Sequence, residues 1–556
     1  MEQGRFIIAI VLSILVFIIW DQFFVERKPV EQPVQKEETQ PVSKETVPVK
    51  EIIVKEPEPE PEAGPAPIVD DAASRKKAKT IIVDTPLYKV KISENGAVFK
   101  SFILKNYKET IDADSPLLEM ISPTIRNGTV GLGLADDSIP GLDKAVFSSN
   151  IDAESVDISK KSQDIIFSWT SPQGVVVEKK FLFSPETYLI GLSVTIKNHS
   201  KTALKDNLIL SLVRPAPSKK SRYGFEGPSA FINNELQQIK IKKIKKQDVY
   251  TGELTWIAVQ DRYFMSAVIP EKPLEASMHL SINSNDMLKS TYMQPVSVVK
   301  PGTREVFEYK LFFGPKSMKI LTTLDYDLVK AVNFGMFDIL AKPCVWIMNF
   351  LYDNLIANYG VAIIILTIFT KVILWPLGTK SYKSMNEMKK IQPLMTEIRE
   401  KYKDDKKKLN EETMALYKTY KVNPVGGCLP MVVQIPVFFA LYRMLYEAIE
   451  LRHAPFLGWI NDLSAPDRLF RFDFSVPLMQ APYGIPVLTI IMGATMFIQQ
   501  KMSPAVGDPA QARMMKIMPI AFTFIFINFS SGLVLYWLVN NILSIAQQYY
   551  ITRTTA

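Results

Sequence analysis

The stretch Asn358–Leu377 reads NYGVAIIILTIFTKVILWPL, and the rest of the chain is organised around it. It has the roughly 20 mostly apolar residues that a membrane-spanning helix needs, so it predicts a span. Lys371 lies well inside this run, where an ammonium costs roughly 2.5–3.5 kcal/mol on insertion scales. Thr367 lies one helical turn earlier on the same face. The lysine either snorkels to nearby headgroups or faces protein, water or a negative partner, and this stretch alone leaves both readings open.

Composition indicates a membrane protein with soluble parts. The 556 residues are 47% hydrophobic and 22% charged, which suits one or two soluble domains and several spans. The net charge of +8 is modest and the basic excess is local, so it bears on membrane orientation before nucleic acid. The apolar run Phe6–Trp20 has no small-residue cleavage pattern after it and predicts an uncleaved anchor. The Pro-, Glu- and Lys-rich segment 26–80 predicts a disordered tether.

Strand patterns fill the segment 81–325. Tyr188–Lys197 alternates apolar with small or polar residues, and Asn95-Gly96 is a turn signal, so we expect a β-sandwich domain. We find no metal-ligand spacing, nucleophile elbow or phosphate loop, and therefore expect no enzyme activity, cofactor or metal. A carboxylate pair assembled only by folding would escape this search.

The basic segment Thr379–Lys421 sets the predicted orientation, because short basic loops stay in the cytoplasm. It places the β-domain in the periplasm and both termini in the cytoplasm. We expect a multi-pass α-helical membrane protein with six spans, five of them in a C-terminal core, and a periplasmic β-sandwich domain. The predicted divisions are 1–25 signal-anchor span, 26–80 tether, 81–325 β-sandwich domain, 326–357 interfacial amphipathic helix, 358–378 span 2, 379–423 cytoplasmic helical hairpin, 424–446 span 3, 447–482 periplasmic loop, 483–502 span 4, 503–513 cytoplasmic loop, 514–530 span 5, 531–551 span 6 and 552–556 tail.

Polar residues recur inside the predicted spans. Tyr536, Asn540, Ser544 and Gln548 are four residues apart and form one helix stripe, while Gln434 stands alone in an apolar run. Such residues either join neighbouring helices or line a hydrated cavity, which Lys371 would make positive.

Three long motifs carry a family resemblance. Val422–Tyr442 (VNPVGGCLPMVVQIPVFFALY), Phe497–Pro504 (FIQQKMSP) and Ser531–Trp537 (SGLVLYW) resemble the YidC family of membrane-protein insertases. The anchor and large outer domain resemble its Gram-negative form. The resemblance implies a hydrophilic groove, open to cytoplasm and lipid, that moves hydrophobic segments of nascent inner-membrane proteins into the bilayer and assists their folding.

The resemblance also implies residue roles. Lys371 matches the groove charge, where many members have arginine, and Gln434 and Trp537 match groove-lining positions; the polar pattern adds Thr367, Tyr536 and Asn540. The implied substrate slide consists of Ile435, Phe438, Ile520, Thr523 and Phe526. The implied docking residues of the hairpin are Lys389, Lys390, Arg399, Lys406, Lys407 and Lys408.

The partners expected from the resemblance are nascent inner-membrane proteins, the Sec translocon with its accessory subunits, the signal-recognition-particle machinery, the ribosome and lipids, but not DNA. The tail 552–556 is short, so we do not expect the tail-mediated ribosome binding of some members. Two alternatives remain at this point: a small-solute transporter, or an envelope scaffold that uses the β-domain.

Overall fold

A computed structural model describes residues 78–217, 224–422, 429–502 and 509–555. The predicted signal-anchor span 1–25 and nearly all of the tether 26–80 lie outside the described residues. Within the described part, strands occupy most of the chain up to residue 315, and long helices follow from residue 338.

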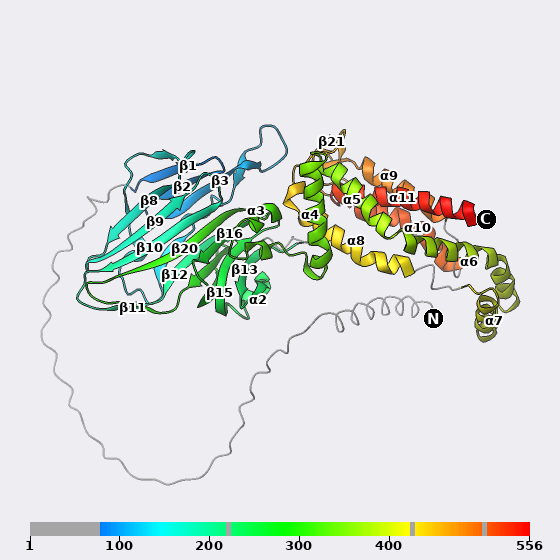
Figure 1. Ribbon diagram of the computed structural model, residues 1–556, viewed down its shortest axis with the longest axis horizontal. Helices are drawn as coiled ribbons and strands as arrows, with labels where there is room; N and C mark the ends of the chain where they lie inside the picture. The colour runs from blue at the N-terminus through cyan, green and yellow to red at the C-terminus, as the bar shows by residue number, and fades with distance from the viewer. Residues whose placement is uncertain (1–77, 218–223, 423–428, 503–508, 556) are drawn as a thin grey trace, which may run out of the picture. The chain divides into compact units, whose positions relative to one another are not determined.

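Two large sheets and one two-stranded sheet form the β-domain (Figure 1). The strands of the smaller sheet, in spatial order, are β4 (Leu117–Glu119), β3 (Val98–Lys108), β2 (Tyr88–Ser93), β1 (Thr80–Asp84) and β7 (Ser155–Asp157). Those on the main path of the larger sheet are β5 (Gly131–Leu134), β12 (Leu208–Pro215), β18 (Met287–Met293), β17 (Leu274–Ile282), β15 (Val249–Gln260), β16 (Phe264–Pro270), β20 (Arg304–Pro315), β10 (Leu189–Asn198), β9 (Val175–Phe183), β8 (Gln163–Thr170) and β6 (Ser148–Ser149). The hairpin β13 (Gly227–Ile232) and β14 (Glu235–Gln238) joins at β15, and β11 (Leu204–Asp206) pairs with β19 (Ser297–Val299).

Aromatic side chains from both sheets meet between them. Phe99 and Phe102 on β3 face Phe181 on β9 and Phe313 on β20, with ring centroids 5.2 Å apart for Phe99 and Phe181 and 4.9 Å for Phe102 and Phe313. All four side chains are almost fully buried. The expected β-sandwich is therefore confirmed, and the alternating burial of β10 follows the predicted period of two.

One charged side chain lies in this core. The alternation that points Val177 and Phe181 inward also points Lys179 inward, and its side chain is fully buried. The Lys179 ammonium donates hydrogen bonds to the carbonyl oxygens of Ala97, at 2.5 Å, and Val130, at 3.0 Å. Burial lowers the pKa of Lys179 to about 7. Ala97 and Val130 both have positive φ, of 47° and 62°, which residues with a side chain seldom adopt. The lysine therefore hydrogen-bonds two segments of unusual backbone conformation to each other.

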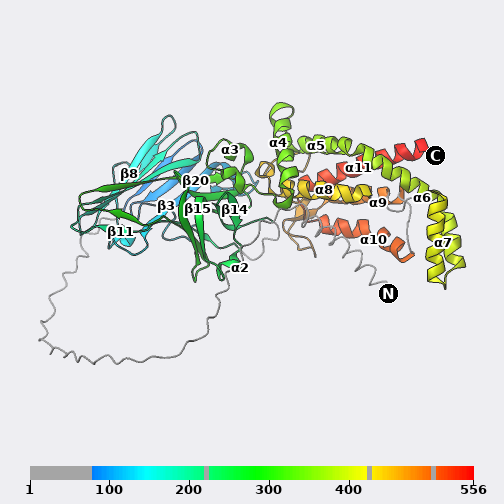
Figure 2. The same cartoon turned by 60° about the horizontal axis from the view of Figure 1, so that its bottom comes forward.

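Helices dominate the rest of the described chain (Figures 1 and 2). The long ones are α4 (Asp338–Asn354), α5 (Tyr359–Ile373), α6 (Trp375–Lys401), α7 (Lys406–Thr419), α8 (Leu429–Glu447), α9 (Val487–Met502), α10 (Pro509–Phe526) and α11 (Ser531–Thr555). Short elements are α2 (Ile241–Ile244), α3 (Met318–Thr322), the 3-10 helices η1 (Leu142–Lys144), η2 (Leu328–Ala331), η3 (Gly335–Phe337) and η4 (Ile449–Leu451), and the hairpin strands β21 (Leu469–Phe472) and β22 (Tyr483–Ile485).

The boundary between α5 and α6 is a bend of 64°. Asn358 caps α5 by accepting a hydrogen bond from the Val361 amide at 3.1 Å, and Pro376 lies in the first turn of α6. Among the described residues no single helix has both the length and the mean hydropathy required to cross a membrane, whereas α5 and α6 pass that criterion as a bent pair. The six-span count therefore remains a prediction.

Helix α11 packs against α5, α6 and α9. Gly378 on α6 lets α11 approach closely, because a methyl group there would lie 2.9 Å from Gln547 Nε2. That amide donates to the carbonyl oxygen of Trp375 at 3.0 Å. Close contact at this point holds the start of α6 against the polar side of α11.

Helix α6 extends beyond this contact and ends beside α7, away from the other helices (Figure 2). Met388, Ile391 and Met395 of α6 are buried with Val422 in a small separate core. The side chain of Asp405 caps α7 by accepting from two backbone amides in its first turn. Helix α7 and most of α6 lie within the predicted hairpin 379–423, but α6 begins at Trp375, inside the predicted span 358–378.

Candidate functional site

Lys371 lies in the last turn of α5, directly before the bend into α6. Its neighbours Val372 and Ile373 are 61% and 60% exposed, so one side of this turn is apolar and open. The lysine side chain is half-buried and points into a pocket between helices. At this turn, α5 therefore has an exposed apolar side, formed by Val372 and Ile373, and a polar side, formed by Lys371, that faces the pocket.

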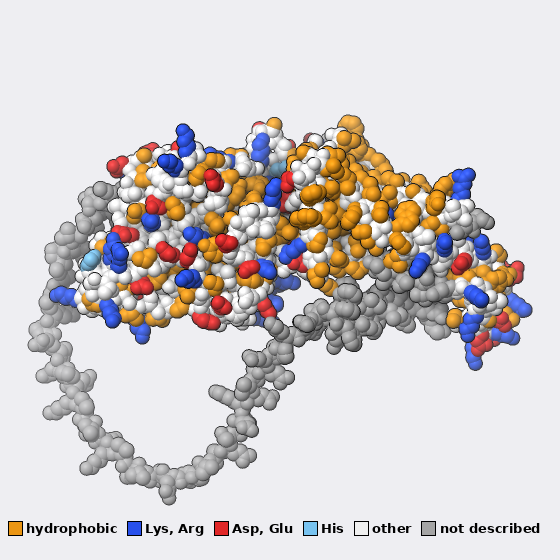
Figure 3. All heavy atoms as spheres, in the orientation of Figure 1, with side chains coloured by type: hydrophobic (Ala, Val, Ile, Leu, Met, Phe, Trp, Pro, Cys, Tyr) orange, Lys and Arg blue, Asp and Glu red, His pale blue; other side chains and the backbone are white. Residues whose placement is uncertain are grey.

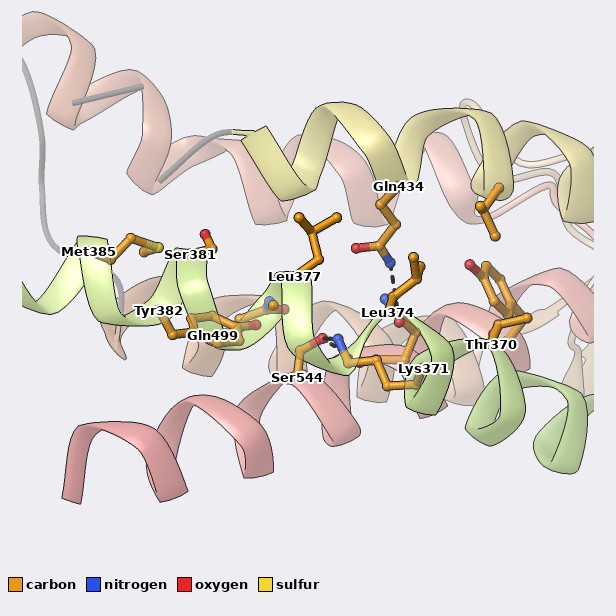
Figure 4. Close-up of a pocket in the computed structure, with 14 residues that line it drawn as sticks. Thr370, Lys371, Leu374, Leu377, Ser381, Tyr382, Met385, Gln434, Gln499 and Ser544 are labelled. Carbon is orange, nitrogen blue, oxygen red and sulfur yellow. Dashed lines mark hydrogen bonds between the residues drawn. The ribbon is translucent and has the colours of Figure 1, made fainter. Parts of the chain in front are cut away.

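The pocket has a volume of about 170 Å³, which is room for several water molecules. Five helices contribute to it: α5, α6, α8, α9 and α11 (Figure 4). The lining residues are Thr370, Lys371, Leu374, Leu377, Gly378, Ser381, Tyr382, Met385, Gln434, Val437, Gln499, Tyr536, Asn540 and Ser544.

A short hydrogen-bond chain fixes the polar wall. The Lys371 ammonium donates to Ser544 Oγ at 2.7 Å, and Ser544 Oγ donates to the backbone carbonyl of Asn540 at 2.7 Å. On the opposite side, Gln434 Nε2 donates to Asn540 Oδ1 at 3.3 Å. Figure 4 shows Lys371 and Ser544 pointing toward each other, with Gln434 reaching in from α8.

The charge of the pocket is positive. Lys371 supplies it, and none of the fourteen described lining residues carries a carboxylate. Among the described residues, the Lys371 ammonium donates one hydrogen bond, to the Ser544 hydroxyl, which leaves two ammonium hydrogens for water or a polar ligand. The pocket can therefore attract an acidic or polar chain segment, since charges at low effective dielectric interact strongly.

Four of the six predicted groove residues line this pocket: Lys371, Gln434, Tyr536 and Asn540. The other two lie outside its lining. Thr367 is buried and its hydroxyl donates to the carbonyl oxygen of Ile363 at 2.7 Å, within its own helix.

Trp537 packs against aromatic rings rather than lining the pocket. Its ring lies 4.6 Å from that of Phe438 and 4.8 Å from that of Phe526, centroid to centroid. Phe526 is buried, whereas Ile435 and Ile520 are 41% and 56% exposed. The predicted slide residues therefore divide into exposed positions and positions that support them from behind.

Thr523, the fifth predicted slide residue, lies where α10 approaches α9. Its hydroxyl donates to the carbonyl oxygen of Pro519 at 2.8 Å. A methyl group on Gly493 of α9 would lie only 2.1 Å from Thr523 Oγ1, so this contact depends on glycine.

The predicted docking residues lie on α6 and α7. Lys389, Lys390, Lys407 and Lys408 are exposed, and Arg399 is half-buried. The Lys406 side chain is outside the described part of the structure.

Sequence reasoning missed the lining residues Ser381 and Tyr382 of α6 and Gln499 of α9. The bend after Ile373 brings the first two to the pocket. Gln499 stands in the quoted FIQQKMSP motif, so its polar side chain within an apolar helix was the available signal.

Comparisons with known proteins identify the family. A family model described as "60Kd inner membrane protein" matches residues 350–556, and one described as "YidC periplasmic domain" matches residues 80–347. The chain is 41% identical over 557 residues to the membrane protein insertase YidC of Syntrophus aciditrophicus (strain SB), covering 98% of this chain and 99% of that protein. It is also 41% identical over 561 residues to that of Syntrophobacter fumaroxidans (strain DSM 10017 / MPOB), covering 99% and 100%. A crystal structure of an active YidC insertase with its first transmembrane domain resolved matches at 20% identity and a TM-score of 0.37, over 85% of this chain and 93% of that chain.

The fold and the pocket define a protein with a β-sandwich domain, a group of long helices and a positively charged polar cavity among those helices. The two family models together match most of the chain and identify its family more specifically than the fold does. The chain belongs to the YidC family of inner-membrane insertases, as the sequence motifs predicted. It is a membrane protein insertase, which decides against the transporter and scaffold alternatives, and this family is not a family of enzymes.

Proposed function

We propose that the pocket around Lys371 receives the polar flank of a nascent membrane protein while its apolar segment leaves for lipid. The observation that carries this proposal is the Lys371 ammonium, which lies in a polar pocket without a lining carboxylate. A client carboxylate or a hydrated polar segment would gain an interaction there that it lacks in the bilayer.

The apolar part of the client has an adjacent surface. Ile435 on α8 and Ile520 on α10 are exposed, and behind them Phe438 and Phe526 converge on Trp537. We assign Ile435 and Ile520 as the contact positions of the slide and the aromatic cluster as its support. Burying apolar client surface in lipid contributes roughly 25 cal/mol per Å², which drives the transfer without nucleotide hydrolysis.

The proposal includes the predicted six-span topology, with the β-domain in the periplasm and the α6–α7 hairpin in the cytoplasm. The exposed lysines of the hairpin support a role in docking, because a basic surface attracts ribosomal RNA and anionic lipid. The signal-recognition-particle machinery is a further proposed partner of the hairpin. We propose that some clients are inserted by this chain alone and others with the Sec translocon and its accessory subunits.

Insertion of a short single-span client into liposomes that contain only this chain tests the proposal. Lys371→Gln removes the charge and keeps a polar side chain, Lys371→Arg keeps the charge, and Lys380→Gln removes a charge from an exposed position on α6 outside the pocket lining. We expect protease protection of the client to fall with Lys371→Gln and to persist with the other two variants. Equal protection with Lys371→Gln would contradict the role of the charge, and no protection with the unaltered chain would contradict autonomous insertion.

A further inference from the structure

The β21–β22 hairpin, residues 469–485, presents large apolar side chains outward. Phe470, Phe474 and Leu478 are 72%, 65% and 76% exposed. Figure 3 shows hydrophobic side chains gathered over the end of the helical part at which Figure 1 places β21. Such a concentration on one short hairpin exceeds the scattered apolar exposure of an ordinary surface and indicates an interaction site.

The backbone of the hairpin is held firmly from beneath. The Arg468 guanidinium donates to the carbonyl oxygen of Pro482 at 2.9 Å and to that of Ile527 at 2.8 Å. The Asn528 amide donates to the carbonyl oxygen of Leu478 at 2.7 Å. The hairpin is thus tied to the residues that directly follow α10.

Two of the exposed residues have a constrained conformation. Phe470 and Leu478 have φ values of 50° and 67°, in the left-handed region that side-chain-bearing residues seldom adopt. Together with the hydrogen bonds beneath, this restrains the backbone that carries Phe470 and Leu478. The exposure is therefore built into the fold.

The apolar surface continues from the hairpin onto neighbouring helices. β22 leads directly into α9, where Ile490 and Ile491 are 50% and 44% exposed, and on α10 Phe524 and Ile525 are 56% and 55% exposed. In an inner-membrane protein, such exposed helix sides face lipid. Arg471 of β21 is 54% exposed and already has an ion-pair partner in Asp112, 3.9 Å away, so the proposal rests on the apolar side chains and not on this cation.

The hairpin lies at the end of the helical part where α5 and α11 begin. Ser531, at the start of α11, donates to the carbonyl oxygen of Asp462 at 2.7 Å, and Asn358, the cap of α5, donates to that of Phe456 at 3.1 Å. The chain enters this end from the β-domain through α4. The membrane leaflet at this end is the one on the side of the β-domain.

We propose that Phe470, Phe474 and Leu478 insert into the headgroup region of that leaflet, and that the hairpin thereby anchors the end of α10. Helix α10, Pro509–Phe526, has 18 residues and rises about 27 Å against a hydrocarbon core of about 30 Å, so it has no length to spare and its depth depends on what holds its end. The hydrogen bonds of Arg468 and Asn528 connect the hairpin to residues 527 and 528, so the depth of the hairpin in the leaflet also sets the depth of the end of α10. The inference rests on the membrane location of the family and not on the role of the pocket.

Depth-dependent quenching tests the insertion. In the full chain with Cys344→Ser and Cys428→Ser, a fluorophore on Phe474→Cys is compared in liposomes with one on Leu182→Cys, a 41% exposed position of the β-domain. We expect lipids with nitroxide at the headgroup to quench the hairpin label at least about threefold more than the control label, and aqueous iodide to quench it less. Equal iodide quenching at both positions would overturn the proposal. Shielding of the hairpin label from iodide without quenching by any nitroxide lipid would indicate a protein occupant and would also overturn it.

The anchoring of α10 has a separate readout. A fluorophore on Ile525→Cys reports the depth of the end of α10, with and without Phe470→Ser, Phe474→Ser and Leu478→Ser together. We expect these substitutions to change the ratio of shallow to deep nitroxide quenching at position 525 by about twofold or more. An unchanged ratio would refute the anchoring, and the triple substitution leaves every pocket-lining residue intact, so this result is independent of the proposed role of Lys371.

Discussion

Charge attraction between Lys371 and its client predicts an energetic coupling that can be measured. The two changes are Lys371→Gln in the insertase and Asp→Asn in the polar tail of a single-span client. Because the described residues that line the pocket include no carboxylate, none of them neutralises the ammonium before the client arrives. Each change alone should slow insertion, and the second change should add little once the first has been made.

The size of the coupling follows from the geometry of the pocket. Two unit charges about 5 Å apart interact by roughly 3 kcal/mol at an effective dielectric of about 20. Water in a cavity of about 170 Å³ screens part of this, so we expect about 1–3 kcal/mol, or roughly 5- to 150-fold in the rate of insertion. Lys371→Arg should keep most of the coupling, because it keeps the charge.

The assay is the initial rate of protease protection in liposomes for all four combinations of insertase and client. Lys380→Gln with the same two clients is the matched control, since it removes an equal charge from an exposed position on α6. Rates that are additive to within about 0.5 kcal/mol would refute direct attraction by Lys371. The pocket would then act through hydration alone.

Three further predictions concern the stability of the fold. Burial lowers the pKa of Lys179 to about 7, so between pH 7 and about 10.5 the unfolded chain keeps a proton that the folded chain loses. The free energy of unfolding of the β-domain in the full chain should therefore rise with pH in this window, by at most about 1.4 kcal/mol per unit, and Lys179→Met should remove the rise in urea titrations. Gly493→Ala should lower the thermal stability of the helical part by about 1–3 kcal/mol through collision with Thr523, whereas Gly131→Ala, with open space around it, should not. Asp405→Ala should destabilise the first turn of α7 by about 0.5–2 kcal/mol and speed its amide hydrogen exchange, while Asp405→Asn preserves the cap.

Each of these predictions has a contradicting outcome. A pH-independent difference between the unaltered chain and Lys179→Met would show that the lysine keeps its proton throughout. An unchanged melting temperature for Gly493→Ala would mean that α9 and α10 separate at little cost. Equal hydrogen exchange in Asp405→Ala and the unaltered chain would show that water replaces the cap fully.

The β-sandwich was predictable because its signal is local. Alternating burial along β10 is visible in the order of its residues, and the sheet pairs neighbours with matching patterns. The same alternation in β9, VVVEKKFLF, points Lys179 to the inner face, so the burial of this lysine could also have been predicted from the sequence. The hydrogen-bond partners of Lys179 could not be predicted, because Ala97 and Val130 are far from it in the sequence.

The pocket was predictable only in part. Four-residue spacing identified the polar side of α11, and Lys371 stood out by its charge, so both could be assigned from single helices. Ser381 and Tyr382 join them because α6 turns by 64° after α5, an angle no local pattern encodes. Trp537 follows Tyr536 by about 100° around the helix, which turns it away from the pocket toward the aromatic cluster.

A hydroxyl partner for Lys371 suits a site that must bind and release. If a lining carboxylate held the ammonium, a client would have to break a partly buried ion pair, at a cost of about 3–5 kcal/mol for the partner left alone. The Ser544 hydroxyl is a neutral acceptor whose hydrogen bond is worth about 1.5–3 kcal/mol, and water or a client oxygen can replace it. Ser544 also keeps its own bond to the Asn540 carbonyl, so it stays satisfied as a donor when the lysine turns to a client. The positive charge is therefore held in place without being neutralised, which permits weak, repeated use by successive clients.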